Sequence, residues 1–326
     1  MTKYIITGGA GFIGSHVAEY LSKKKKKVVI LDNLSTGRIE NIKNFKSKIK
    51  FVNCDISKKG KWINEFKGKI YVIHLASVAD IVPSIQFPEK YFNSNVKGTL
   101  NILNACRKCK VLKLVYSASS SCYGIPKKYP TKEIDELKPM YPYALTKKIG
   151  EDLIIHWSKV YNIPFISLRL FNVYGTRSRT SGTYGAMFGV FLAQKLFNKP
   201  FTIVGTGKQK RDFTYVSDVV SAIVKACSSK IKNEIFNVGS SDTVSILKIV
   251  QILKGTKIFI KKRPGEPDIT FANISNIKRK LNWKPKIKIE EGINLMLKDI
   301  QYWKNAPVWT PSKIKKATKL WFKYLK

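Results

Sequence analysis

Tyr143 and Lys147 lie four residues apart in the predicted helical segment YPYALTKKIGEDL. Side chains at this spacing share one helix face, so the ammonium group is expected beside the phenol. A free tyrosine, with a pKa of about 10, is a weak base at neutral pH, and a nearby positive charge favours its phenolate form. The pair therefore predicts a general acid or base that acts on a substrate hydroxyl.

Serines occupy four of the five positions 117–121 in the stretch VYSASSSCYG. An apolar run precedes them, so they fall where a strand is expected to end. In open parallel sheets, ligands bind beyond the carboxyl ends of the strands. These hydroxyls are therefore candidates for an active site.

The N-terminal segment YIITGGAGFIGSHVAEYL reads as a strand, a glycine turn and a helix. Gly9, Gly11 and Gly14 have the G-x-G-x-x-G spacing, and a looser version begins at Gly8. Such a turn brings the backbone close to a pyrophosphate, which rests on the helix N-terminus. Asp32 ends the second predicted strand, where its carboxylate would bind ribose hydroxyls and repel a 2′-phosphate. The pattern predicts NAD rather than NADP.

Short apolar runs alternate with helical segments through the first half of the chain, which indicates a parallel sheet covered by helices. The predicted helices are Phe12–Lys24, Glu89–Arg107 and Tyr143–Tyr161. We expect an α/β protein with a Rossmann-type doubly wound sheet and a smaller mixed α/β lobe. The expected NAD-binding domain spans 1–172, with 212–240 returning to it, and the substrate-binding lobe spans 173–326.

The composition of the chain limits the classes of function that the protein can have. The 326 residues are 44% hydrophobic, which fits a globular protein, and they carry a net charge of +39. The 52 lysines are spread along the whole chain and only eight arginines are present, whereas nucleic-acid surfaces concentrate charge and use arginine forks. The five scattered cysteines, including the pair Cys106 and Cys109, lack the second pair of a zinc site, so no metal is expected. No signal peptide is predicted, which favours a cytoplasmic protein.

Ten ordered segments between residue 1 and about residue 300 resemble the extended short-chain dehydrogenase/reductases, specifically their sugar-nucleotide epimerase/dehydratase branch. They are TGGAGFIGSH, DNLSTG, HLAS, NVKGT, SASSSCYG, YALTK, RLFNVYG, RDFTYVSDV, FNVG and RPGEPD. The resemblance implies that Tyr143 removes the proton of the sugar C4 hydroxyl while the C4 hydride passes to a tightly bound NAD, which is regenerated in each turnover. It further implies that Lys147 holds the nicotinamide ribose and that Ser119 bonds the C4 oxygen.

The same resemblance assigns the remaining site residues. The cofactor-binding candidates are Gly8, Gly11, Phe12, Ile13, Gly14, Asp32, Asn33, Asp55, Ile56, Leu75, Ala76, Ser77, Asn95, Tyr143 and Lys147. The substrate-binding candidates are Ser119, Ser120, Ser121, Asn172, Ala186, Met187, Phe201, Arg211, Arg263 and Thr270. Among them, Asn172 resembles the residue that holds a substrate phosphate, and Arg211 and Arg263 resemble a diphosphate clamp. We expect Ala186, Met187 and Phe201 to flank the base, and the family implies a homodimer.

Ser120 and Ser121 indicate which reaction of this branch the site can catalyse. Dehydratases of this branch carry an adjacent Asp and Glu at these positions, and elimination of water needs such an acid and base. The serines favour a 4-epimerase that acts on UDP-glucose, UDP-N-acetylglucosamine or UDP-glucuronate, and the small Thr270 leaves room at C2. Another nucleotide-sugar epimerase or a 4,6-dehydratase-like enzyme is the alternative. A nucleic-acid-binding or regulatory Rossmann protein is the alternative from another class.

Residues 303–326 form a predicted helical extension. Thr310 followed by Pro311 is a sound helix start. Ile314, Ala317, Trp321 and Tyr324 then make one apolar stripe, which we expect to pack on the body of the protein or on a dimer partner.

Overall fold

Seven parallel strands form the central sheet of the part of the chain that this computed structural model describes, residues 2–109, 111–178 and 186–325. Their order is β11-β6-β5-β4-β1-β2-β3, so the direction of winding reverses between β1 and β4. The bounds are β1 (Lys3–Thr7), β2 (Lys27–Asp32), β3 (Lys50–Asn53), β4 (Ile70–His74), β5 (Lys113–Ser119), β6 (Phe165–Leu170) and β11 (Glu234–Val238). The predicted doubly wound sheet is confirmed, and the segment after residue 212 does contribute a strand to it.

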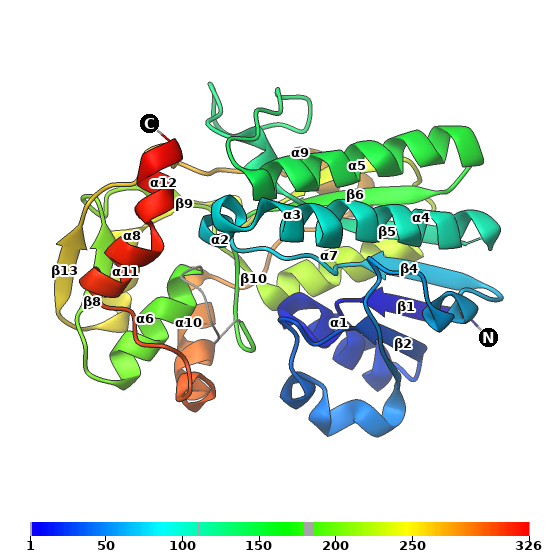
Figure 1. Cartoon of the computed structure of the whole chain (residues 1–326), viewed down its shortest axis with the longest axis horizontal. Coiled ribbons are helices and arrows are strands. Elements are labelled where there is room, and N and C mark those ends of the chain that lie inside the picture. Colours follow the sequence, from blue (N-terminus) through cyan, green and yellow to red (C-terminus); the bar gives the residue numbers. More distant parts are fainter. Residues whose placement is uncertain (1, 110, 179–185, 326) are drawn as a thin grey trace.

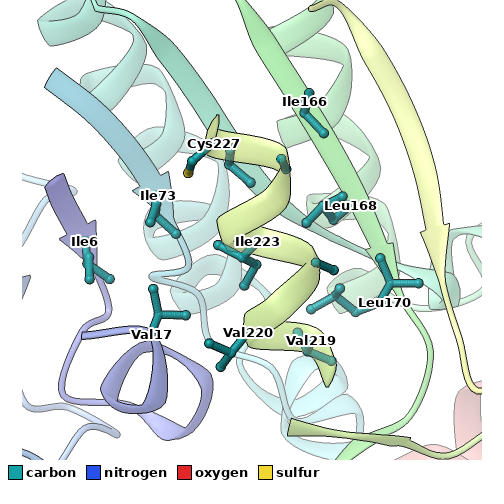
Figure 2. Packing of buried hydrophobic residues seen from close by; sticks show 14 of the residues in the cluster. Ile6, Val17, Ile73, Ile166, Leu168, Leu170, Val219, Val220, Ile223 and Cys227 are labelled. Atoms are coloured by element: carbon teal, nitrogen blue, oxygen red, sulfur yellow. The ribbon is translucent and has the colours of Figure 1, made fainter. Parts of the chain in front are cut away.

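Helices cover both faces of this sheet (Figure 1). On one face, α1 (Phe12–Lys23) packs beside α7 (Val216–Ser228). Figure 2 shows Val219, Val220 and Ile223 of α7 over Ile73 and Leu168 of the strands. Strands buried on both faces are expected to be nearly continuous apolar runs, as the inner strands β2 and β4 are.

The opposite face carries α4 (Gly98–Lys108) and α5 (Pro142–Tyr161). The helix predicted over Glu89–Arg107 is a short α3 (Pro88–Tyr91), a π-helical turn η4 (Phe92–Lys97) and then α4. A π-turn inserts an extra residue into the helix without breaking it, and sequence periodicity does not reveal it.

Four short elements connect the Rossmann strands. They are η1 (Ile39–Asn41), η2 (Lys43–Lys48), η3 (Lys61–Glu65) and α2 (Ile81–Gln86). A further short helix, η5 (Ser120–Tyr123), follows β5 directly.

The second lobe has its own apolar core, which includes Phe191, Phe201 and Trp303. Its helices are α6 (Met187–Leu196), α8 (Ile246–Leu253) and α10 (Ile289–Lys298), whereas α9 (Ser275–Leu281) packs against β11 of the central sheet, with Ile277 and Leu281 in the core of that sheet. Its strands pair as β7 (Val173–Tyr174) with β10 (Thr214–Tyr215), β9 (Lys210–Arg211) with β12 (Val244–Ser245), and β8 (Phe201–Val204) with β13 (Lys257–Ile260).

The C-terminal segment continues through η6 (Ile300–Trp303), α11 (Pro311–Ala317) and α12 (Lys319–Tyr324). The predicted helix start is confirmed, because Thr310 Oγ1 accepts a hydrogen bond from the backbone N–H of Lys313. Ile314 and Trp321 are buried against the body, whereas Tyr324 is 60% exposed, so the apolar stripe packs only in part. Within the described residues, no helix is long and apolar enough to cross a membrane.

Candidate active site

A cavity of about 520 Å³ opens at the carboxyl ends of β1, β4 and β5, where the winding of the sheet reverses. This is the position at which open α/β sheets bind ligands. The predicted cofactor residues that line it are Gly8, Gly11, Phe12, Ile13, Gly14, Asp32, Asn33, Asp55, Ile56, Leu75, Ala76, Ser77, Tyr143 and Lys147. The predicted substrate residues that line it are Ser119, Ser120, Ser121, Asn172, Ala186 and Arg263.

The glycine turn after β1 has room for no side chain. Gly8 has a φ of +68°, and a Cβ there would lie 2.8 Å from the backbone of Ala76. A Cβ on Gly14 would lie 2.1 Å from the carbonyl oxygen of Gly8. The N-cap of α1 is Gly11, which has no side chain to cap the first N–H groups, so these donors are left for a ligand.

Asp32 is held at the end of β2 by two backbone donors. Its Oδ2 accepts from Ala10 N at 2.9 Å and its Oδ1 accepts from Leu34 N at 2.8 Å. Burial raises the pKa of Asp32, and the two hydrogen bonds oppose this effect. The remaining lone pairs suit ribose hydroxyls at this end of the cavity.

Two neighbouring residues of the cavity wall each have a buried polar atom without a hydrogen-bond partner among the described residues. These atoms are Arg177 Nη1 and Ser178 Oγ. A donor left unpaired in the interior is costly, whereas a phosphate or ribose would supply its acceptor. These atoms and the glycine turn fit a bound dinucleotide.

Tyr143 and Lys147 both lie in α5 and face the same cavity. The side chain of Ser119, the last residue of β5, lies near the Tyr143 hydroxyl, and both residues line the cavity. Burial raises the pKa of Tyr143, and the nearby Ser119 side chain opposes this effect. Burial lowers the pKa of Lys147 to about 8. The site can thus present a phenol near a serine hydroxyl and an ammonium group.

Lys147 Nζ also lies 4.4 Å from the centroid of the Tyr116 ring. An ammonium over an aromatic face is stabilised without a paired carboxylate. The charge therefore remains available to the phenol and to a ligand in the cavity.

A buried ion pair fixes α5 against the sheet. One helical turn beyond Lys147, Glu151 Oε1 lies 2.6 Å from Arg169 Nη2, and its Oε2 accepts from Ser167 Oγ at 2.6 Å. Burial disfavours the charge on Arg169, but the bonds and charge of Glu151 raise its pKa overall. The helix that carries the candidate acid-base residue is thereby tied to β6.

A second buried network joins the glycine turn to η4. Thr99 Oγ1 donates to Asn95 O at 2.6 Å, so His74 Nε2 must donate to Thr99 Oγ1, at 2.9 Å. His74 Nδ1 then accepts from Thr7 Oγ1 at 2.7 Å. Burial lowers the pKa of His74 to about 3, so the imidazole stays neutral. Thr7, His74, Asn95 and Thr99 all lie in the sequence motifs, but nothing in the sequence indicates that they bond to one another.

Asn95, a predicted cofactor residue, lies behind the cavity wall. Its Oδ1 accepts from Val78 N at 2.8 Å, and its Nδ2 donates to Thr146 Oγ1 at 3.0 Å. Val78 lines the cavity and Asn95 does not, so Asn95 would support a ligand through Val78.

The substrate end is shaped by Asn172, whose φ is +26°. Its Nδ2 donates to Thr270 Oγ1 at 2.7 Å and to Asp212 O at 3.0 Å. Thr270, which we expected near the sugar C2, does not line this cavity, and its hydroxyl instead accepts a hydrogen bond from Asn172. The two residues are 98 positions apart, so no local sequence pattern predicts this contact.

A second cavity of about 220 Å³ adjoins the first, and Ala186, Asn172 and Arg263 line both. Met187 and Arg211, two further predicted substrate residues, line the second cavity. Burial lowers the pKa of Arg211.

Phe201, expected beside the base, is only 1% exposed and lines neither of these two cavities in the described part of the chain. Its ring centroid lies 5.2 Å from that of Phe191 in the core of the second lobe. The first residue of β8 points inward because strand residues alternate between faces. In the arginine-rich loop 175–191, residues 179–185 lie outside the described residues.

Several cavity residues were not among the predicted ones. Arg38 and Tyr302 lie together, with the guanidinium carbon 5.2 Å from the ring centroid, and Tyr302 also donates to Asn41 Oδ1 at 2.8 Å. Glu266 pairs with Arg263, and Trp321 comes from the C-terminal segment. The motif RPGEPD contains Glu266, but no sequence signal points to Tyr302 or Trp321.

Comparisons with known proteins agree with this geometry. The model of the NAD dependent epimerase/dehydratase family matches residues 4–239. UDP-glucuronate 4-epimerase of Thermodesulfobacterium geofontis is 34% identical over 312 residues, which cover 90% of this chain and 94% of the relative.

Two solved structures share the fold at similar identity. The UDP-glucuronic acid 4-epimerase of Bacillus cereus, solved with UDP-glucuronic acid and NAD, is 33% identical with a TM-score of 0.84, covering 92% of this chain and 99% of that one. The UDP-N-acetylglucosamine 4-epimerase of Methanobrevibacter ruminantium M1, solved with UDP-N-acetylmuramic acid, is 30% identical with a TM-score of 0.86, covering 92% and 97%.

Proposed function

Because this chain belongs to the NAD dependent epimerase/dehydratase family, we propose that it is an NAD-dependent epimerase that inverts C4 of a UDP-hexose. The family predicted from the sequence motifs is confirmed. The substrate class is that of its relatives, which act on UDP-glucuronate and UDP-N-acetylglucosamine.

The placement of Tyr143, Lys147 and Ser119 on the wall of one cavity carries this proposal. Tyr143 takes the proton of the C4 hydroxyl, and Ser119 bonds the same oxygen as it becomes a carbonyl. Bound NAD supplies the chemistry of a reversible hydride acceptor. The 4-keto sugar then presents its other face, and Tyr143 returns the proton to the C4 oxygen of the inverted product.

The cofactor would be held by the groups already described. The open N–H groups of α1 suit its pyrophosphate, and Asp32 suits a ribose diol. Lys147 holds the other ribose and favours the phenolate of Tyr143, which a nearby positive charge stabilises.

Dehydration is the alternative that the site disfavours. Ser120 and Ser121 line the cavity next to Ser119, and neither can protonate a leaving hydroxyl or remove a carbon-bound proton as a carboxyl group does. The residues at this edge therefore suit transfer of a hydride from the sugar to NAD and back to the sugar, without elimination of water.

The direct test is to incubate the NAD-loaded protein separately with UDP-glucose, UDP-N-acetylglucosamine and UDP-glucuronate and to separate the products. We expect the C4 epimer of at least one of them, and none with a Tyr143→Phe preparation, which controls for contaminating enzymes. Absence of every C4 epimer would overturn the proposal, and a stable 4-keto, 6-deoxy product would establish dehydration instead.

We also propose a homodimer. Phe92 on η4 and Leu145 on α5 are 51% and 47% exposed, and these elements lie side by side on one face of the molecule (Figure 1). Large exposed apolar side chains on neighbouring helices favour a helical interface. Sedimentation should give a dimer for the native protein and a monomer for a Phe92→Asp, Leu145→Asp variant.

We further propose that residues 1–172 with 212–240 form the NAD-binding domain and that 173–326 form the substrate lobe. A cytoplasmic location and a role in supplying polysaccharide precursors follow from the proposed substrate class, since nucleotide sugars are glycosyl donors. The dispersed lysines support no specific nucleic-acid partner.

A further inference from the structure

Trp321 of α12 lines the larger cavity with its indole almost wholly buried, at 1% exposure. Its Nε1 donates to the carbonyl oxygen of Pro264 at 2.8 Å. The family model ends at residue 239, so both residues lie outside the matched region. Pro264 belongs to the motif RPGEPD, whereas Trp321 lies beyond the last of these motifs, so the C-terminal segment adds a contact to the site that the motifs alone do not indicate.

Arg263 lies against this indole. Its guanidinium carbon is 5.7 Å from the Trp321 ring centroid, and its Nη2 is 2.7 Å from Glu266 Oε1. The turn between Pro264 and Glu266 passes through Gly265 at a φ of +73°. Trp321 thus holds both the backbone of this turn and the guanidinium that the turn presents to the two cavities.

The indole also contacts the residue that precedes α5. The Trp321 ring centroid is 5.8 Å from that of Tyr141, and Ser121 lines the same cavity as Trp321. Trp321 therefore contacts both the turn that carries Arg263 and the start of α5. These two contacts, together with the bond to Pro264, fix its position.

We propose that Trp321 is a positioning residue for the diphosphate of the substrate: it holds Arg263 in the orientation that binds a nucleoside diphosphate. A partly desolvated cation over an indole face is stabilised, and an arginine fixed before binding loses less side-chain entropy when it meets its anion. The ligand class rests on the proposed function, whereas the contacts belong to the structure itself.

The test measures binding of UDP and of uridine to the NAD-loaded protein by calorimetry. Trp321→Ala should weaken UDP about tenfold, a loss within the range of a cation–π contact. It should weaken uridine by less than about twofold, because uridine has no phosphate for Arg263. NAD content should not change, since α12 lies far from α1 (Figure 1).

Three control variants distinguish a loss of the aromatic contact with Arg263 from a general loss of structure. Trp321→Leu keeps an apolar side chain without an aromatic face and should show the same selective loss. Trp321→Phe keeps the ring and should stay within about threefold of the native affinity for UDP. Tyr324→Ala, on the same helix at 60% exposure, should bind UDP as the native protein does.

A double-mutant cycle decides whether Trp321 acts through Arg263. In an Arg263→Met background, Trp321→Ala should change UDP affinity by less than about twofold. An additive tenfold loss, an equal loss for UDP and uridine, or no loss at all would each overturn the proposal. None of these measurements needs turnover. Native protein that binds UDP in this way but converts no UDP-sugar would refute the proposed function alone.

Discussion

Glu151 and Arg169 form a buried ion pair that joins the helix of the candidate acid-base residues to the central sheet. Glu151 Oε1 and Arg169 Nη2 are 2.6 Å apart, and their side chains are 2% and 4% exposed. Arg169 Nη1 also donates to the Tyr123 hydroxyl and to Glu133 O, both at 2.9 Å. The position of α5, and with it that of Tyr143, depends on a charge pair that water does not reach.

Removing one partner of this pair should be strongly destabilising. Glu151→Ala leaves the Arg169 charge buried without its partner, so we expect the free energy of unfolding to fall by about 3–5 kcal/mol in urea denaturation. The matched control is the next residue: Asp152→Ala removes an exposed pair with Lys148 and should cost less than about 1 kcal/mol. Similar losses for both variants would show that the buried pair does not fix α5.

Tyr143→Phe should remove turnover while the cofactor stays bound. The substitution deletes only the hydroxyl that moves the C4 proton, and loss of such a group costs about 10²–10⁴ in rate. The rate is followed as C4 epimer formed per minute, and retained NAD is measured in the purified variant. Near-native turnover would show that another group moves the proton.

The rate should fall above about pH 8 as Lys147 loses its proton. Burial lowers the pKa of Lys147 to about 8, so its positive charge is lost as the pH rises through that value, and stabilisation of the Tyr143 phenolate is lost with it. Initial rates between pH 6.5 and 10 would reveal this limb in kcat/KM.

Loss of the folded state through deprotonation of Lys147 would not explain this fall in kcat/KM. The folded pKa of Lys147 lies below the value of about 10.4 in an unfolded chain, so this group makes folding more favourable as the pH rises from 8 to 10. Circular dichroism at each pH is the control. A rate that stays level beyond pH 9.5 would contradict the assignment.

Asp32→Ala should weaken NAD and reduce the preference for NAD over NADP. The substitution removes the acceptor of the ribose hydroxyls and also the charge that repels a 2′-phosphate. Fluorescence titration of the stripped protein with NADH and NADPH measures both effects. Asp55→Ala is a useful comparison, because it removes another cavity carboxylate and should leave the NADPH affinity low.

Residues close in sequence were predicted well because their geometry is local. The i, i+4 spacing of Tyr143 and Lys147 needs only a helix to bring both to one cavity, and the glycine turn needs only its flanking strand and helix. The sequence order of the strands, together with the family motifs, then predicted the sheet.

Residues far apart in sequence were not predicted, because tertiary packing alone decides their contacts. Thr270 meets Asn172 across 98 residues, and Trp321 meets Pro264 across 57. Phe201 faces the core because of the direction in which β8 enters the second lobe, which no local pattern fixes. Asn95, which the family resemblance assigns to the cofactor, also accepts a hydrogen bond from Val78 N, a contact that no local pattern indicates.

Strand β11 pairs with β6 although the chain builds much of the second lobe between them. All six residues of β6 are buried in the folded protein, and their outer edge stays open during synthesis until β11 leaves the ribosome. At typical elongation speeds, this delay lasts roughly 3 to 13 s. While the edge of β6 is unpaired, it can pair with strands of other nascent chains, which leads to aggregation. Ample chaperone during expression should therefore raise the yield of soluble protein more than any change to the surface lysines.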